Sequence, residues 1–365
     1  MYESAVMPTI EQICLQSADE FDMISGCVLN ATNVMQNSNY TQEISFNQQF
    51  TNGIIRDIAK IQISDIYCPY CCNLEYNRTH YLPAEQDTVL YDDSKILEIL
   101  PRQGCEDSTK LIVGIRSAPN EWEDRDWIRN TWAKHYKTNT KIIFLIGKHK
   151  KNATINNFVA QENDKYGDIL VMGFNDHYYN LTLKDYGFFE YILKHCKNVN
   201  CILKPDIDTV NNVPGFELLC DLLPENEQMI TGRSWESGVV RNIQSKWYVP
   251  KYVYAKENYA PFPVGWTFFI SGNGTIEKLQ NTIKSKTTFL ISENYRRLSD
   301  DALIMGDIRI LAGIPFQDIG GFGLQQVSYW SDIRTGYQEI PLASEVENHN
   351  REEIWQKMKA SINYK

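Results

Sequence analysis

Four short, continuous apolar segments constrain the fold of this chain more than any other feature of its sequence. They are LIVGI (111–115), KIIFLIG (141–147), DILVMGF (168–174) and CIL (201–203). Such runs are typical of strands that are buried on both faces, as in parallel sheets. Amphipathic helices are predicted between them, over residues 124–135 and 181–195. The alternation predicts an α/β domain with a largely parallel sheet and right-handed crossovers.

Two carboxylates, Asp206 and Asp208, follow the last of these runs and are separated by Ile207. Pro205 has no backbone N–H, so we expect it to end the ladder and the acids to emerge at the carboxyl edge of the sheet. Open α/β sheets bind ligands at this edge, and paired carboxylates suit a hard divalent cation that holds a diphosphate. Such acid pairs are also common on solvated loops, so the motif alone is weak evidence.

A second acid pair, Asp300-Asp301, precedes an apolar segment at 302–311 that is predicted to be helical. Ser299 is suited to cap that helix, and carboxylates in a first turn interact favourably with the helix dipole. Capping accounts for Ser299 and for one of the two acids. It leaves the other carboxylate available for chemistry.

The composition is that of an ordinary globular protein, with 43% hydrophobic and 22% charged residues in a chain of 365. The formal net charge of −10 disfavours a nucleic-acid-binding surface. No apolar run reaches the roughly 18 residues of a transmembrane helix, and residues 1–30 lack the pattern of a signal peptide.

Cysteines and glycosylation sequons favour a secretory lumen. The nine cysteines are Cys14, Cys27, Cys68, Cys71, Cys72, Cys105, Cys196, Cys201 and Cys220. The six sequons begin at Asn30, Asn39, Asn77, Asn152, Asn180 and Asn273. Cys68 and Cys71 have zinc-ligand spacing, but no second pair follows and His80 stands alone, so disulfides are the favoured interpretation. An odd number of cysteines leaves at least one without an intrachain partner.

Composition divides the chain into three regions. Residues 1–108, rich in Asn, Gln and Ser and containing the cysteine cluster, are predicted to be a stem or cap. Residues 109–325 carry the α/β pattern, with a further helix at 216–223 and a strand at 264–271. Residues 326–365 are predicted to be a helical tail that places Ile354, Trp355, Met358 and Ile362 on one face.

Five separated segments share their residues and order with the motifs of one known family. They are Arg125-Asp126-Trp127-Ile128-Arg129-Asn130-Thr131-Trp132, then 166–169 with 173–184, Lys204-Pro205-Asp206-Ile207-Asp208, 246–248 with 259–271, and Asp300-Asp301 with Gly306. Together they resemble the β1,3-glycosyltransferases (glycosyltransferase family 31), which include β1,3-galactosyl- and β1,3-N-acetylglucosaminyltransferases. The resemblance runs from about residue 110 to 323.

The resemblance implies a GT-A fold, with a Rossmann-like, mostly parallel central sheet and flanking helices. It implies inverting transfer of a hexose or N-acetylhexosamine from a UDP-sugar to a hydroxyl of a glycan acceptor on protein or lipid, with formation of a β1,3 linkage. Mn²⁺ or Mg²⁺ would be held by Asp206 and Asp208. The implied location is the lumenal side of the Golgi membrane, through an anchor outside this sequence.

The resemblance also suggests roles for individual residues. Asp301 is the candidate general base, with Asp300 as the alternative, because the attacking hydroxyl must lose its proton. The candidates for donor binding are Arg125, Asp176, Lys184 and Asp206. For the first three, a structural ion pair is the alternative. The candidates for acceptor binding are Trp266 and Gly265, and Trp266 is either a stacking platform for a sugar or a core residue.

The chain departs from the family pattern near the expected metal site. Ile207 replaces the middle acid of the metal motif, and no histidine follows Asp301 before His349. These departures support one alternative function, a non-catalytic sugar-binding relative. A second alternative is a nucleotide-sugar hydrolase, which would release UDP without an acceptor.

Overall fold

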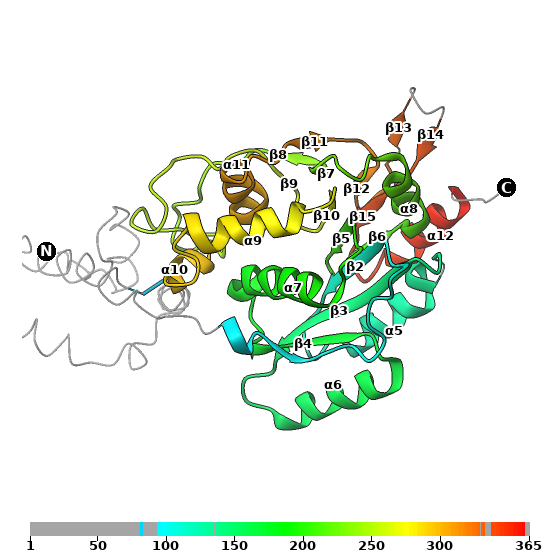
Figure 1. Cartoon of the computed structure of the whole chain (residues 1–365), viewed down its shortest axis with the longest axis horizontal. Helices are drawn as coiled ribbons and strands as arrows, with labels where there is room; N and C mark the ends of the chain where they lie inside the picture. Colours follow the sequence, from blue (N-terminus) through cyan, green and yellow to red (C-terminus); the bar gives the residue numbers. More distant parts are fainter. Residues whose placement is uncertain (1–80, 83–92, 135, 329, 333–336, 362–365) are drawn as a thin grey trace, which may run out of the picture. The chain divides into compact units, whose positions relative to one another are not determined.

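The computed structural model describes residues 81–82, 93–134, 136–328, 330–332 and 337–361 (Figure 1). The chain divides into two compact units, Met1–Tyr81 with Arg241–Tyr248, and Leu82–Val240 with Val249–Lys365. Residues 243–247 of the first unit form two turns with a bend between them. The central sheet and the candidate site belong to the second unit.

A mixed sheet of eight strands, counted over the described residues, forms the centre of the second unit. Its strands in spatial order are β1 (Leu97–Ile99), β4 (Ile169–Asn175), β3 (Thr140–Lys148), β2 (Leu111–Arg116), β5 (Cys201–Pro205), β10 (Thr267–Ser271), β7 (Met229–Gly232) and β11 (Phe316–Asp318). Strands β4, β3, β2 and β5 are parallel neighbours and correspond to the four apolar runs. The predicted α/β class with a parallel centre is confirmed.

One edge of this sheet collects several strand ends. Strand β10 runs antiparallel to both β5 and β7, and β7 is parallel to β11. The carboxyl ends of β2, β5, β7 and β11 therefore lie at the same edge, together with the amino end of β10. This is the edge at which open α/β sheets bind ligands.

Helices cover both faces of the sheet (Figure 1). One face shares a hydrophobic core with the helices α5 (Trp122–Asn130), α6 (Ala153–Tyr166), α8 (Val213–Leu222) and α12 (Arg351–Ser361). The other face packs against α7 (Leu181–His195), on which α9 (Thr275–Lys286) lies. A Cβ on Gly114 of β2 would lie 2.4 Å from the Phe188 ring of α7, so glycine permits this close approach.

The sequence predicted a helical C-terminal region, but this region also contains strands. It contributes the strands β13 (Trp330–Asp332), β14 (Tyr337–Ile340) and β15 (Ala343–Glu345) before α12. Strand β15 lies between β12 (Phe322–Leu324) and β6 (Thr209–Asn211) in a second sheet, so the region is built into the fold. Ile354, Trp355 and Met358 are buried as predicted, while Ile362 lies outside the described residues.

Three sequence predictions differ from the structure. Strand β1 belongs to the segment 1–108, expected to be a separate region, yet it pairs with β4 in the central sheet. Pro205 does not end the pairing of β5, because it lies opposite Thr267 of antiparallel β10. The helix predicted at 216–223 begins earlier, at Val213, because Asn212 caps it and Pro214 fits its first turn.

The predicted Ser299 cap is also wrong. The segment after the second acid pair is a π-helix, η7 (Asp301–Ile308), followed by α11 (Arg309–Leu311), and no side chain caps its start. The carboxylate of Asp301 itself accepts the N–H of Ala302 at 2.7 Å. The Ser299 hydroxyl instead forms a hydrogen bond with this carboxylate.

Two disulfides join described cysteines, Cys105 with Cys196 and Cys201 with Cys220. The disulfides predicted for the cluster at Cys68, Cys71 and Cys72 lie outside the described residues. The other five cysteines, His80 and the first three sequons lie outside the described residues. Within the described part of the chain, no helix is both long and apolar enough to cross a membrane.

Candidate active site

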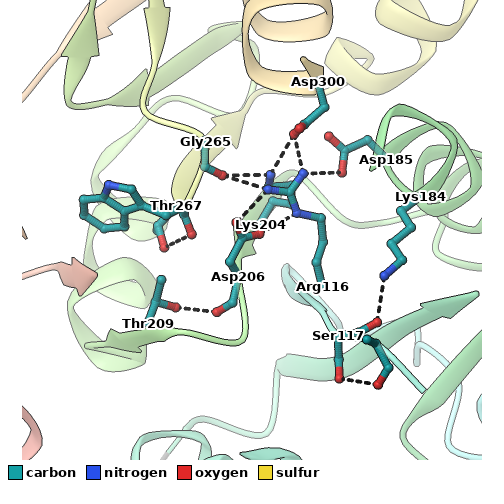
Figure 2. A network of polar contacts seen from close by, with 12 residues as sticks. Arg116, Ser117, Lys184, Asp185, Lys204, Asp206, Thr209, Gly265, Thr267 and Asp300 are labelled. Carbon is teal, nitrogen blue, oxygen red and sulfur yellow. Dashed lines mark hydrogen bonds and ion pairs between the residues drawn. The ribbon is translucent and has the colours of Figure 1, made fainter. Parts of the chain in front are cut away.

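A buried ion network occupies the edge of the sheet where the strand ends meet (Figure 2). Arg116 is the last residue of β2, and it forms an isolated parallel bridge with Asp206, which follows β5. The Arg116 side chain is only 4% exposed. Its Nε and Nη2 donate to the two carboxylate oxygens of Asp206, with Nη2–Oδ2 at 2.8 Å. Sequence reasoning missed Arg116, although a cation that ends a buried strand beside an acid pair was a usable signal.

The same guanidinium reaches two further segments. Nη1 of Arg116 donates to Asp300, and Nη2 donates to the carbonyl oxygen of Gly265 at 3.1 Å. Lys204 of β5 is fully buried, and its Nζ donates to the same Gly265 oxygen at 3.0 Å and lies 3.3 Å from Asp300. Two buried cations therefore join β2, β5, the start of β10 and the start of η7.

The adjacent acids Asp300 and Asp301 have opposite electrostatic environments. Burial alone would raise the pKa of Asp300, but the charges of Arg116 and Lys204 outweigh it and lower this pKa to about 2. Burial and repulsion from Asp300 raise the pKa of Asp301 to about 6. Asp300 is thus a fixed anion that is committed to two cations. Asp301 is the acid with proton affinity near neutral pH.

The carboxylate of Asp301 is held in place by its neighbours. Its Oδ1 accepts the N–H of Ala302 and the hydroxyl of Ser299. Its Oδ2 faces the backbone of Gly265, where a Cβ would lie only 2.7 Å away. In the described part of the chain no donor bonds Oδ2, so this oxygen is available to a ligand.

Asp206 and Asp208 lie on the short turn between β5 and β6. The hydroxyl of Thr209 donates to the carbonyl of Asp206 at 2.7 Å, and the N–H of Val346 donates to the carbonyl of Asp208 at 2.9 Å. The side chain of Asp206 is 26% exposed, and that of Asp208 is exposed. The turn therefore presents two carboxylates to solvent at the edge of the sheet.

These two carboxylates suit a hard cation. Partial desolvation and repulsion from Asp206 raise the pKa of Asp208 to about 7. A bound cation would relieve the repulsion part of this shift. No three His, Cys, Asp or Glu side chains within the described ranges surround one metal position. Diphosphate oxygens and water would have to complete a coordination shell around Asp206 and Asp208.

Arg125 and Lys184 both bind the loop that follows β2. Arg125 donates to the Ser117 hydroxyl at 2.9 Å and the Ala118 carbonyl at 2.7 Å, and it forms a two-point ion pair with Glu162. Lys184 donates to the Ser117 carbonyl at 2.7 Å.

Asp176 is connected to the same loop through Lys184. The two side chains form an ion pair at 2.9 Å, and Asp176 also accepts the N–H of Gly147 at 2.7 Å. Arg125 and Lys184 are almost completely buried. The three residues therefore form the structural ion pairs given above as the alternative to direct donor binding, and they fix the loop beside Arg116.

Trp266 and Gly265 lie next to the ion network but differ in exposure. Trp266 is only 8% exposed, and the centroid of its ring lies 6.1 Å from that of Phe322. The Trp266 ring therefore belongs to the core. Its backbone carbonyl accepts the N–H of Asp206 at 2.8 Å and thereby positions the acid. The core alternative for this tryptophan therefore holds.

A cavity of about 400 Å³ lies two strands from Asp206 at the same edge. Its lining residues are Arg233, Asp318, Ile319, Gly320, Phe322, Gly323, Gln326 and Ser328. The carbonyl of Arg233 accepts the N–H of Val264, which precedes Gly265. The segment 264–265 thus connects the ion network to Arg233 in the wall of this cavity. The sequence offered no signal for the cavity, because its lining comes from distant segments.

The sequence of this chain is similar to those of known glycosyltransferases. A family model described as Galactosyltransferase matches residues 123–309, just over half of the chain. Mouse β1,3-galactosyltransferase 1 is 27% identical over 255 residues, which cover 68% of this chain and 73% of that protein. Rat UDP-GlcNAc:βGal β1,3-N-acetylglucosaminyltransferase 7 is 27% identical over 220 residues, 55% of each protein. The match thus spans about half the length of this rat relative.

A solved structure of the galactosyltransferase LgtC, in complex with donor and acceptor sugar analogues, is a more distant neighbour. It is 8% identical and aligns over 70% of this chain and 97% of that one, with a TM-score of 0.34. A likeness at this level carries no conclusion about function.

Replacing Gly265 by alanine tests the packing of Asp301. The added methyl would lie 2.7 Å from Oδ2 and 3.2 Å from Cγ of a carboxylate held by Ser299 and Ala302. We expect the free energy of unfolding to fall by about 1–3 kcal/mol, the usual cost of overpacking, in denaturant titrations. Gly104→Ala is the matched control, because nothing lies within 4 Å of its Cβ position. Equal stability of both variants would contradict the predicted packing.

Proposed function

The chain belongs to the galactosyltransferase family, and from this premise we propose that it is a β1,3-glycosyltransferase that transfers a hexose or N-acetylhexosamine from a UDP-sugar to a glycan hydroxyl with inversion. The observation that carries the proposal is the placement of Asp301. A half-buried carboxylate with a raised pKa lies at the same sheet edge as the exposed Asp206 and Asp208. A general base and a diphosphate site are the two elements that this chemistry needs.

In this proposal Asp206 and Asp208 hold Mn²⁺ or Mg²⁺ together with the diphosphate of the donor. The cation supplies positive charge where the leaving UDP becomes more negative. Arg116 and Lys204 support the site by fixing Asp300 and the Gly265 carbonyl beside it. Arg125, Lys184 and Asp176 act on the donor through the loop at 117–119, which they hold in place.

Asp301 accepts the proton of the attacking hydroxyl. We prefer Asp301 to Asp300, the alternative base, because two cations bind Asp300 and lower its pKa to about 2. A carboxylate with such a low pKa is a poor proton acceptor at neutral pH. The Oδ2 atom of Asp301 is the oxygen that would take the proton, since Oδ1 is occupied by Ser299 and Ala302.

We place the acceptor sugar in the cavity lined by Arg233, Asp318 and Gln326. Planar charged and amide side chains with several donors and acceptors suit a ligand rich in hydroxyls. Gly265, rather than the buried ring of Trp266, would contact the acceptor, because its Cβ position lies 2.7 Å from Oδ2 of Asp301. The two disulfides and the sequon at Asn273, an exposed residue, support a lumenal location, for which we propose the Golgi.

Metal-dependent release of UDP tests the proposed reaction. With Mn²⁺, a panel of UDP-sugars and a panel of glycan acceptors, we expect UDP release that requires an acceptor, stops on addition of EDTA and returns with excess Mn²⁺. Mass spectrometry of the product would identify the sugar transferred. Release without any acceptor would support a hydrolase instead, and sugar binding without release would support a non-catalytic relative. Release that resists EDTA would contradict the metal site.

Asp301→Asn tests the assignment of the base. We expect turnover to fall by about 10²–10⁴-fold, the usual contribution of a well-placed base, with UDP-sugar affinity unchanged by calorimetry. Asp307→Asn is the control, since this acid of the same helix bonds Tyr254 at 2.6 Å and lies away from the network. A wild-type rate for the Asp301 variant would refute the role.

The pH profile gives a second reading of the same assignment. The base must be deprotonated to accept a proton, and the pKa of Asp301 is raised to about 6. The kcat/KM of the wild-type protein should therefore be level above this pH and fall as the pH drops through about 6. An acid limb near pH 4, the ordinary range of an exposed carboxyl group, would show that another residue is the base.

Arg233→Ala tests the acceptor cavity, because Arg233 lines this cavity and not the one beside α12. Losing a hydrogen bond from a charged group costs about 1.5–3 kcal/mol, so we expect the KM for the acceptor to rise about tenfold or more for Arg233→Ala, with the KM for the donor unchanged. Lys357→Ala is the control, because Lys357 lines a different cavity beside α12. If Lys357→Ala raised the acceptor KM and Arg233→Ala did not, the acceptor would lie in that second cavity.

A further inference from the structure

One buried carboxylate in the network has no hydrogen bond. Asp185 on α7 is fully buried, and neither of its oxygens has a hydrogen-bond partner among the described residues. Burying a carboxylate without such partners is costly, so buried charges are nearly always paired. Both oxygens of Asp185 are therefore able to accept a hydrogen bond that this state of the site does not supply.

The nearest cation to Asp185 is Arg116. Its Nη1 lies 3.9 Å from Oδ1 of Asp185, which is within ion-pair range but beyond a hydrogen bond (Figure 2). Burial raises the pKa of Asp185 to about 7, against the opposing charges of Lys204 and Arg116. Asp185 thus faces a guanidinium that is hydrogen-bonded to other carboxylates.

Arg116 forms ion pairs with three carboxylates, which differ in their other contacts and in their exposure. Asp300 also has Lys204 as a partner and stays anionic, so it is a fixed contact of the guanidinium. Asp206 takes both other donors but is 26% exposed and is the acid proposed to hold the metal. Asp185 receives no hydrogen bond. Of the two carboxylates besides Asp300, one is accessible to a ligand and the other is sealed in the core.

We propose that Asp185 is a positioning residue that receives the Arg116 guanidinium when Asp206 binds the divalent cation with the diphosphate of the donor. This proposal rests on the proposed function. Asp206 cannot direct the same oxygen lone pairs at Arg116 and at a metal, so the cation competes with the arginine. A shift of Nη1 of about 1 Å towards Asp185 would bring the pair to hydrogen-bond distance, while the contact with Asp300 is kept.

This exchange would lower the cost of metal binding. Without a second anionic partner, an arginine displaced from Asp206 would keep only the Asp300 carboxylate and the Gly265 carbonyl in a buried environment. With Asp185 beside it, the guanidinium exchanges one carboxylate for another. In the metal-free state Asp185 therefore lacks a hydrogen bond, and in the metal-bound state it accepts one from Arg116.

Mn²⁺ affinity in the presence of UDP, measured by calorimetry or by the electron paramagnetic resonance of free Mn²⁺, tests the proposal. For Asp185→Asn we expect Mn²⁺ binding about 10-fold weaker, within the usual range of coupling between sites. The melting temperature of the metal-free variant should be unchanged or higher, because a buried charge without a hydrogen bond is removed. A residue with a merely structural role would instead lower the melting temperature and leave Mn²⁺ affinity unchanged.

Glu190→Gln is the matched control. It also removes a buried carboxylate of α7, but one whose hydrogen bonds go to Gln280 and Lys284 of α9. We expect a lower melting temperature with Mn²⁺ affinity unchanged. Equal Mn²⁺ affinity of wild type and Asp185→Asn would overturn the proposal while leaving the proposed function intact. Absence of Mn²⁺ binding by the wild type would overturn both.

A crystal structure of the wild-type protein with Mn²⁺ and UDP gives a direct reading that does not depend on any variant. We expect Arg116 Nη1 or Nη2 within about 3.2 Å of Asp185, and Asp206 turned towards the metal. An Arg116–Asp206 pair that kept both hydrogen bonds in the metal-bound protein would overturn the proposal.

Discussion

The buried guanidinium of Arg116 is the interaction on which the rest of the site depends. It joins the end of β2 to Asp206 after β5, to the Gly265 carbonyl before β10 and to Asp300 at the start of η7. A buried cation must be compensated by anions, and removing one member of such a group leaves uncompensated charge in the core. The strand ends and the π-helix are therefore held in one arrangement by electrostatics as well as by packing.

The same network separates the roles of two adjacent acids. Asp300 is turned towards Arg116 and Lys204, and its pKa falls to about 2, whereas Asp301 is raised to about 6 by burial and by the negative charge of its neighbour. Pairs of carboxylates whose environments push their pKa values apart commonly divide their tasks in this way. The structural role of one acid thus creates the proton affinity that the other needs.

The C-terminal region has a direct connection to the site. Strand β15 pairs with β6, and the N–H of Val346 bonds the carbonyl of Asp208, so this late segment positions the turn that carries the acids. Strand β1 likewise extends the central sheet from a segment before residue 109. Strand β1 and the described C-terminal segments are therefore parts of the central domain, although the sequence predicted them to flank it.

The sequence by itself determined the parallel strands, their order of appearance, and the acid pairs Asp206/Asp208 and Asp300/Asp301, because apolar runs and short motifs are local in the chain. Only the tertiary structure decided which acid of the second pair is bound by cations, that Trp266 is core, and that Arg116 and Asp185 belong to the site. It also decided the disulfide partners and the strand pairing of the C-terminal region. These features depend on burial and on partners far apart in sequence, which a local pattern of residues does not specify.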